Sequence, residues 1–216
     1  MKKLLLTIVC LSVVSCAATQ NQPVNPETLA TLKGKSLTLI QRESPTFVAM
    51  TSGKGMFAVA GVGAAAAAGN KLVKDNEIAD PAMDISSSLA QALTTRHGLK
   101  LQGQSAGVTA SNDMHDIVKL ADGSEYALDV VTNGWSYIYD GFKFSDYFVG
   151  YSAKLRLIEV NTSKVISGGF CAYDAKKAGK SPVVHEKLLE NNAAYIKQEI
   201  SDAADFCTQQ FIAELF

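Results

Sequence analysis

The stretch Tyr147-Phe-Val-Gly-Tyr-Ser-Ala-Lys-Leu-Arg-Leu-Ile-Glu-Val160 decides the fold. From Tyr147 to Leu157 its odd-numbered positions carry apolar or aromatic side chains, and the even-numbered ones include Gly150, Ser152, Lys154 and Arg156. A period of two residues is that of a β-strand with one buried face, because successive side chains of a strand point to opposite sides. The stretch therefore predicts a long strand that lies on a core.

The sequence on either side predicts more strands. Residues Tyr126–Thr132 alternate in the same way, and the turn Asn161-Thr162-Ser163 leads into Val165–Tyr173, which we expect to return beside its neighbour. We read the three strands as an antiparallel meander. In Asn133-Gly134, after the first of them, we expect a turn.

The rest of the chain adds helices and two further strands. Ser36–Gln41 and Leu99–Gln102 are predicted strands. Asp80–Gly98 is predicted to be a helix, since Asp80 can cap it, Ile85, Leu89 and Leu93 recur every four residues, and Gly98 can end it. A helical tail follows Ser181-Pro182. The order predicts an α+β fold of two layers, a mainly antiparallel or mixed sheet with helices packed on one face.

This order and patterning resemble those of the small periplasmic α/β domains of CsgG-like and TolB-N-terminal-like envelope proteins. The resemblance covers about Ser36 to Phe216 and is best in Tyr126–Thr132 and Tyr151–Glu159. These are strand patterns, so the resemblance implies a fold and an envelope location but transfers no active site.

The first sixteen residues predict where the protein works. Lys2 and Lys3 precede an apolar run that ends in Val13-Val14-Ser15-Cys16, which is typical of a secretory signal and too short to span a bilayer. This ending resembles the lipobox of bacterial lipoproteins. The resemblance implies that residues 1–15 are a signal peptide and that Cys16 receives lipid, with acyl chains such as palmitate. Because Ala17 rather than Asp follows the cysteine, it also implies the cell outer membrane, with the domain facing the periplasm.

The charge of the chain limits the kinds of partner that it is expected to bind. Removing Lys2 and Lys3 from 20 basic residues leaves 18 against 21 acidic ones, a net charge of −3. This balance argues against nucleic acid and provides no polybasic patch for anionic lipid. The polar stretch after Cys16 predicts a flexible tether over residues 16–33, followed by a single periplasmic domain over residues 34–216.

The cysteines fit export. Cys10 leaves with the signal and Cys16 carries lipid, so Cys171 and Cys207 remain. In an oxidising envelope they are expected to form a disulfide, and the alternative is two buried free thiols. Cys207 lies on the apolar stripe of the predicted last helix, which should face the sheet where Cys171 lies.

The Gly/Ala-rich segment Gly55–Gly69 permits several interpretations. Gly61-Val62-Gly63 mimics a dinucleotide-binding fingerprint, but the βαβ units that such a site needs are missing. We favour a buried Ala-rich helix packed on the sheet over a surface that touches a membrane or another helix. If the segment is exposed, the preference reverses, since a bare apolar patch implies a partner.

An aromatic cluster surrounds Asp140-Gly141. Its members Trp135, Tyr137, Tyr139 and Phe142 are a candidate partner surface, and the alternative is packing in a hairpin or the core. Asp113, His115 and Asp116 are spaced closely enough to bind a metal, but with no further ligand pair a solvated loop is the better interpretation. We predict no metal, no cofactor and no catalytic residue.

These observations favour a lipid-anchored cell-envelope protein that is a non-enzymatic binding or assembly factor. Its expected partners are the membrane, through the lipid at Cys16, and another envelope protein or a second copy of itself. Two alternatives stay open. The protein is a periplasmic enzyme, such as a hydrolase, whose site assembles only in the fold, or it is a subunit of a CsgG-like oligomer.

Overall fold

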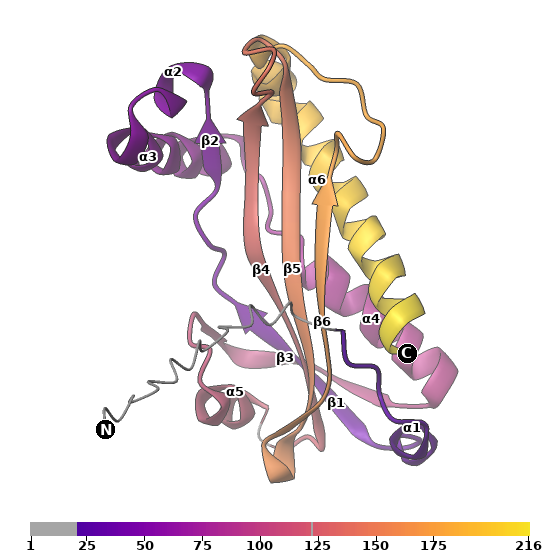
Figure 1. Cartoon of the computed structure of the whole chain (residues 1–216). Coiled ribbons are helices and arrows are strands. Elements are labelled where there is room, and N and C mark those ends of the chain that lie inside the picture. Colours follow the sequence, from indigo (N-terminus) through magenta and orange to yellow (C-terminus); the bar gives the residue numbers. More distant parts are fainter. Residues whose placement is uncertain (1–20, 122) are drawn as a thin grey trace, which may run out of the picture.

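A computed structural model describes residues 21–121 and 123–216 and shows a long mixed sheet with helices packed against it (Figure 1). The strands are β1 (Ser36–Arg42), β2 (Val48–Met50), β3 (Lys100–Thr109), β4 (Tyr126–Tyr139), β5 (Tyr147–Glu159) and β6 (Lys164–Asp174). Their order is β3-β1-β4-β5-β6, with β2 beside the far end of β4. β1 runs parallel to β3 and β4, whereas β4, β5 and β6 form the predicted antiparallel meander. The predicted α+β fold with a mixed sheet is confirmed.

The helices occupy both sides of this sheet. They are α1 (Pro26–Thr31), α2 (Ser52–Gly55), α3 (Ala58–Asn76), α4 (Ala82–His97), α5 (Met114–Leu120) and α6 (His185–Leu215), with a 3-10 turn at Val160–Thr162. α4 and α6 cover the face on which the main core lies, whereas α5 packs against Ile40, Ala127 and Ile158 on the other face. The two helices predicted from the sequence, α4 and α6, therefore share one face as expected. α5 was not predicted from the sequence, and it lies on the other face because Ile117 and its neighbours form a second, smaller apolar cluster there.

The main core follows the alternation seen in the sequence. Leu128 and Val130 of β4 and Leu155 and Leu157 of β5 are buried. The stripe of α4 packs onto them, and the helix is bounded as expected: the Asp80 carboxylate accepts from the Ala82 amide at 3.0 Å, and Gly98 has a φ of 71°. Both ends of the predicted helix are confirmed.

One predicted turn is wrong. β4 does not end at Thr132 but continues through Asn133-Gly134 to Tyr139, with a register shift against β5 at this point. A β-bulge absorbs the residues that favour turns, since one extra residue can be inserted in a strand without ending it. The hairpin turn comes instead at residues 140–146, around Asp140-Gly141.

The last helix is joined to the sheet by a disulfide. Cys171 of β6 and Cys207 of α6 are bonded, with their Cα atoms 5.5 Å apart, which confirms the predicted pairing. α6 is interrupted near its start, because residues Glu190–Ala193 leave helical geometry and three of them have positive φ.

The predicted tether is partly folded. The backbone of Gln22 pairs with Gly168 at the edge strand β6. Val24 and Leu32 are buried, and α1 lies between them. Residues 21–33 therefore pack on the domain instead of hanging free, because two apolar side chains in a polar stretch are enough to dock it. The predicted signal segment 1–15 and Cys16 lie outside the described residues.

None of the helices in the described part of the chain combines the length and apolar character needed to cross a bilayer.

Candidate functional site

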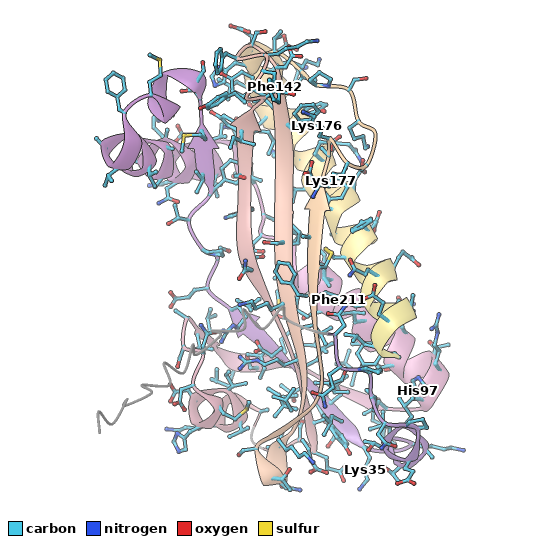
Figure 2. All side chains as sticks on the ribbon, viewed as in Figure 1. Lys35, His97, Phe142, Lys176, Lys177 and Phe211 are labelled. Carbon is cyan, nitrogen blue, oxygen red and sulfur yellow. A yellow bond between two sulfur atoms is a disulfide. The ribbon has the colours of Figure 1, made fainter. Side chains whose placement is uncertain are left out.

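The surface with the most exposed large apolar side chains lies at the end of the molecule where α2, α3 and the β4–β5 hairpin meet (Figure 1). We name it the apolar end surface and define it by Met56, Phe57, Val59, Val62, Phe142 and Phe144. Val59 is 87% exposed and Phe142 is 96% exposed, and Phe142 lies at the tip of the hairpin (Figure 2). Between α2 and the start of α3 lies a shallow hollow of about 420 Å³ with Lys54 and Phe57 in its wall.

The two parts of this surface are joined by Tyr139. α2 passes so close to its ring that a side chain at Gly55 would collide with the hydroxyl. On its other side the ring of Tyr139 lies 5.6 Å from that of Phe144. β2 adds a fixed connection, since Met50 just before α2 pairs with Ile138 of β4. The exposed side chains therefore stand on one connected support.

The Gly/Ala-rich segment has one buried stripe, and its other positions face mostly outward. Gly61, Ala65 and Gly69 recur every four residues and are buried. A Cβ at Gly61 would collide with the carbonyl oxygen of Lys54, and one at Gly69 with that of Phe47. Glycine is thus required for these close approaches. The interpretation as a buried Ala-rich helix packed on the sheet holds for this stripe alone, because one stripe suffices to pack α3 and leaves Val59 and Val62 in water.

The same helix removes the dinucleotide interpretation. Such a fingerprint needs a strand, a glycine turn and then a helix. Here Gly61 and Gly63 lie within α3, which begins at Ala58 and follows α2, so in the described residues no strand leads directly into them.

The aromatic cluster is divided between core and surface. Trp135 and Tyr137 are buried. The indole Nε1 of Trp135 donates to the carbonyl oxygen of Pro45 at 2.9 Å, and its ring meets that of Phe47 edge-on at 5.2 Å. The prediction that Trp135 and Tyr137 belong to a partner surface is therefore wrong, because the bulge before them turns both side chains onto the core face of the sheet. Tyr139 is half-buried, and Phe142 stands in solvent.

Tyr137 also makes a polar contact inside the fold. Its hydroxyl lies 3.1 Å from Nε2 of His185 at the start of α6. Burial raises the pKa of the Tyr137 phenol to about 12. The group is therefore a neutral partner of the imidazole and binds the start of α6 to the sheet.

Sequence reasoning missed a buried ion cluster on the sheet face opposite α4 and α6. The Asp129 carboxylate is fully buried between two arginines. Arg156 reaches one of its oxygens with Nη2 at 2.6 Å and with Nε at 3.0 Å. Nε of Arg42 lies 3.3 Å from the other oxygen. Burial lowers the pKa of the Arg42 guanidinium, which Asp129 opposes. The sequence did place a charged residue in each of two strands with alternating patterns, Asp129 and Arg156. Only the strand register, which pairs these two residues, shows that they are in contact.

The metal candidate lies at the start of α5. Asp113, His115 and Asp116 offer ligand atoms within 4.8 Å of one another, and all three residues are exposed. The Asp113 carboxylate already accepts from the His115 amide at 2.8 Å as the cap of the helix. The three residues form a solvated helix start rather than an enclosed set of ligands.

The histidines do not form a hydrolytic site with a serine in the described residues. His185 bonds to Tyr137, and exposed His115 lies 3.8 Å from Asp116. Nε2 of His97 is buried without a hydrogen-bond partner among these residues. A serine nucleophile needs a histidine within hydrogen-bond reach, and no such pair is found between residues 21 and 216.

No protein-family model and no curated protein matches the chain. Among solved structures, the PelC dodecamer of Paraburkholderia phytofirmans is similar at 10% identity and a TM-score of 0.39, covering 91% of this chain and 96% of that one. A putative neuraminyllactose-binding hemagglutinin homolog from Helicobacter pylori has 14% identity and a TM-score of 0.40, covering 86% and 84%. The C-terminal domain of LpoB from Salmonella enterica has 12% identity and a TM-score of 0.31, covering 65% and 83%. These likenesses are too distant to assign the chain to a family or to carry a function.

Proposed function

We propose that the protein is a lipid-anchored factor of the cell envelope that binds or assembles with another protein through the apolar end surface. Cys16 carries the lipid, at the outer membrane, and the domain faces the periplasm. The observation that carries the proposal is the exposure of six large apolar side chains on one connected support. Soluble proteins seldom leave such a group in water unless it is a binding site.

The charges near this surface favour a protein over lipid as the partner. Lys143 lies 3.8 Å from Asp146, and Lys176 is paired with Asp140 at 2.6 Å. Lys54 has no ion pair in the described residues, and its Nζ donates to the carbonyl oxygen of Ala49 at 3.0 Å. Binding to anionic headgroups depends on an excess of unpaired lysine or arginine, whereas apolar and aromatic side chains with a balanced polar rim are typical of protein interfaces. The occupant is therefore an envelope protein or a second copy of the chain.

Lipid at Cys16 would raise the effective concentration of this surface near its partner. From Cys16 to Gln22, where the described chain joins β6, six residues span about 20 Å at most. A short attachment confines the domain to a thin layer above the bilayer, which favours binding to other envelope components.

The interface is tested by photocrosslinking in intact cells. A photoreactive residue at Val59 should join a protein partner or a second copy, and the same residue at exposed Val108 of β3 is the matched control. The double variant Phe57→Ser with Phe142→Ser should abolish the product. If Val59 gives no more product than Val108, no partner binds the apolar end surface.

Two further measurements separate the remaining occupants. Sedimentation of full-length Cys16→Ala protein with phosphatidylglycerol vesicles should be the same with and without Phe57→Ser, and sedimentation that Phe57→Ser abolishes would make the surface a membrane contact. The mass of the detergent-extracted particle distinguishes an assembly of copies, as in the CsgG-like alternative, from a complex with another protein.

The anchor has its own test. Wild-type protein should incorporate labelled palmitate, and Cys16→Ala should not. Cys10→Ala is the matched control, since this cysteine precedes the expected cleavage. Acyl labelling that persists in Cys16→Ala would refute the anchor without touching the interface.

A further inference from the structure

A hollow of about 600 Å³ lies on the sheet face that α4 and α6 leave uncovered. Its floor is formed by Val131 of β4, Lys154 and Arg156 of β5 and Gly168 of β6. Asn112, before α5, forms part of the rim. This volume is in the range of pockets that bind small molecules. The hollow is separate from the apolar end surface, which lies at the end of the strands.

The charge of this hollow has one sign. Its lining includes two cations, Lys154 and Arg156, and no carboxylate. Asp129 lies beneath it, fully buried, and balances only one of the two arginines that it contacts. The cluster of Arg42, Asp129 and Arg156 thus keeps one positive charge, to which Lys154 adds a second.

The cations present hydrogen-bond donors that the described residues leave open. Arg156 is held by Asp129 through Nε and Nη2, so its orientation is fixed. Its remaining nitrogen, Nη1, has only a contact of 3.5 Å with the carbonyl oxygen of Asn112. Lys154 is exposed and makes no ion pair or hydrogen bond with another side chain in the described residues.

Gly168 keeps the hollow open beside these donors. It pairs with Arg156 across the strands, so a side chain there would stand next to the guanidinium. A Cβ at Gly168 would lie 3.5 Å from the carbonyl oxygen of Leu155, an ordinary contact. The strand therefore accepts a larger residue at this position, and the glycine matters for the space above the sheet.

We propose that this hollow binds a small oxyanion, a carboxylate or phosphate group on a polar body that bears hydroxyls. Nζ of Lys154 and Nη1 of Arg156 bind the anionic group, because charged donors form the strongest hydrogen bonds to such oxygens. The hydroxyls are bound by the side-chain amides of Gln22 and Asn133 and by the amide nitrogen of Asn112, whose oxygen already accepts from Arg42 at 2.6 Å. Asp129 fixes Arg156 before the ligand arrives, which reduces the entropy that binding costs.

The test is calorimetric titration of the purified full chain with three probes of similar size: glucuronate, glucose 6-phosphate and neutral glucose. At least one of the two anions should bind, and glucose should not. The anion that binds identifies the preferred group as a carboxylate or a phosphate. Added salt should weaken the binding, since the attraction is partly electrostatic.

Variants place the binding in the hollow. Lys154→Gln should lower the affinity for the anion about tenfold or more. Lys164→Gln, at an exposed lysine that begins β6, should leave this affinity unchanged. Gly168→Leu fills the hollow and should abolish binding, with its thermal unfolding measured to show that the fold persists. The proposal is overturned if neither anion binds, if glucose binds as well as they do, or if Lys164→Gln weakens binding as much as Lys154→Gln.

Discussion

At the scale of single residues, Asp129 shows how a charge can be buried in a sheet. It lies on the face opposite the main core, where Arg42 and Arg156 contact both of its oxygens. A buried carboxylate without partners would be strongly disfavoured, and two arginines without it would be worse. The three residues therefore act as one unit, and the stability changes caused by replacing them singly should not add up to the change caused by replacing them together.

Neutralising Asp129 should destabilise the fold. Asp129→Asn leaves Arg42 buried without a counter-ion, and breaking a buried pair in this way lowers the free energy of unfolding by about 3–5 kcal/mol. Urea denaturation followed by circular dichroism measures the change. Asp116→Asn, at an exposed position, is the control and should change stability little. A loss below about 1 kcal/mol in Asp129→Asn would show that the cluster is not coupled to folding.

Because the phenol of Tyr137 is buried, we predict that the folded protein loses stability at alkaline pH. Its pKa is raised by burial to about 12 in the folded protein, against an ordinary value of 10.0. The folded state therefore holds this proton more tightly than the unfolded state. Its contribution to stability is complete below pH 10 and is lost as the pH rises through about 12. Denaturant midpoints measured across this range should fall, and Tyr137→Phe should reduce the slope. An equal slope in the variant would contradict the assignment.

At the scale of elements, local patterns predicted most of the fold. The meander and α4 follow from a period of two and a period near four, because these patterns arise from side chains a few residues apart. The sequence could not place β1 between β3 and β4, since parallel pairing joins residues that are distant in the chain. The bulge at Asn133-Gly134 was read as a turn for a related reason: local preference favoured a turn, and pairing with β5 overrode it.

The disulfide is the element-scale feature that is easiest to test. Cys171 and Cys207 are 36 residues apart, and closing a loop of this size stabilises a fold by about 4 kcal/mol on the loop-entropy estimate. The double variant Cys171→Ala with Cys207→Ala should lose about this amount in denaturant unfolding. Reduced wild-type protein should behave like the double variant, whereas reduction should not change the variant further. Mass analysis without reductant should find the two cysteines joined, and free thiols in protein from the envelope would refute the bond.

At the scale of the whole molecule, the candidate site was only half predictable. The sequence identified both the Gly/Ala-rich segment and the aromatic cluster, but not which of their members reach the surface. The exposure of these side chains depends on how α3 packs against β2 and on the bulge that reverses the side-chain directions of β4. Both are properties of the assembled sheet. The hairpin that carries Phe142 and the helix that carries Val59 are far apart in the chain, and the contacts of Tyr139 with α2 and the pairing of β2 with β4 bring them to the same end of the molecule.

The boundary of the folded unit gives the last prediction. Leu32 is fully buried in the main core, and Gln22 exchanges backbone hydrogen bonds with Gly168 of the edge strand β6. We therefore predict that the domain begins near Gln22. Leu32→Ala should destabilise it by about 2–5 kcal/mol, as do other truncations of buried leucine, whereas Thr31→Ala, at an exposed neighbour, should have a small effect.

Hydrogen exchange tests the same boundary. The backbone amides of Gln22 and Gly168 should be protected together, because each donates to the carbonyl oxygen of the other. Fast exchange at both amides would show that residues 21–33 belong to the flexible tether, which would lengthen the reach of a lipid anchor at Cys16.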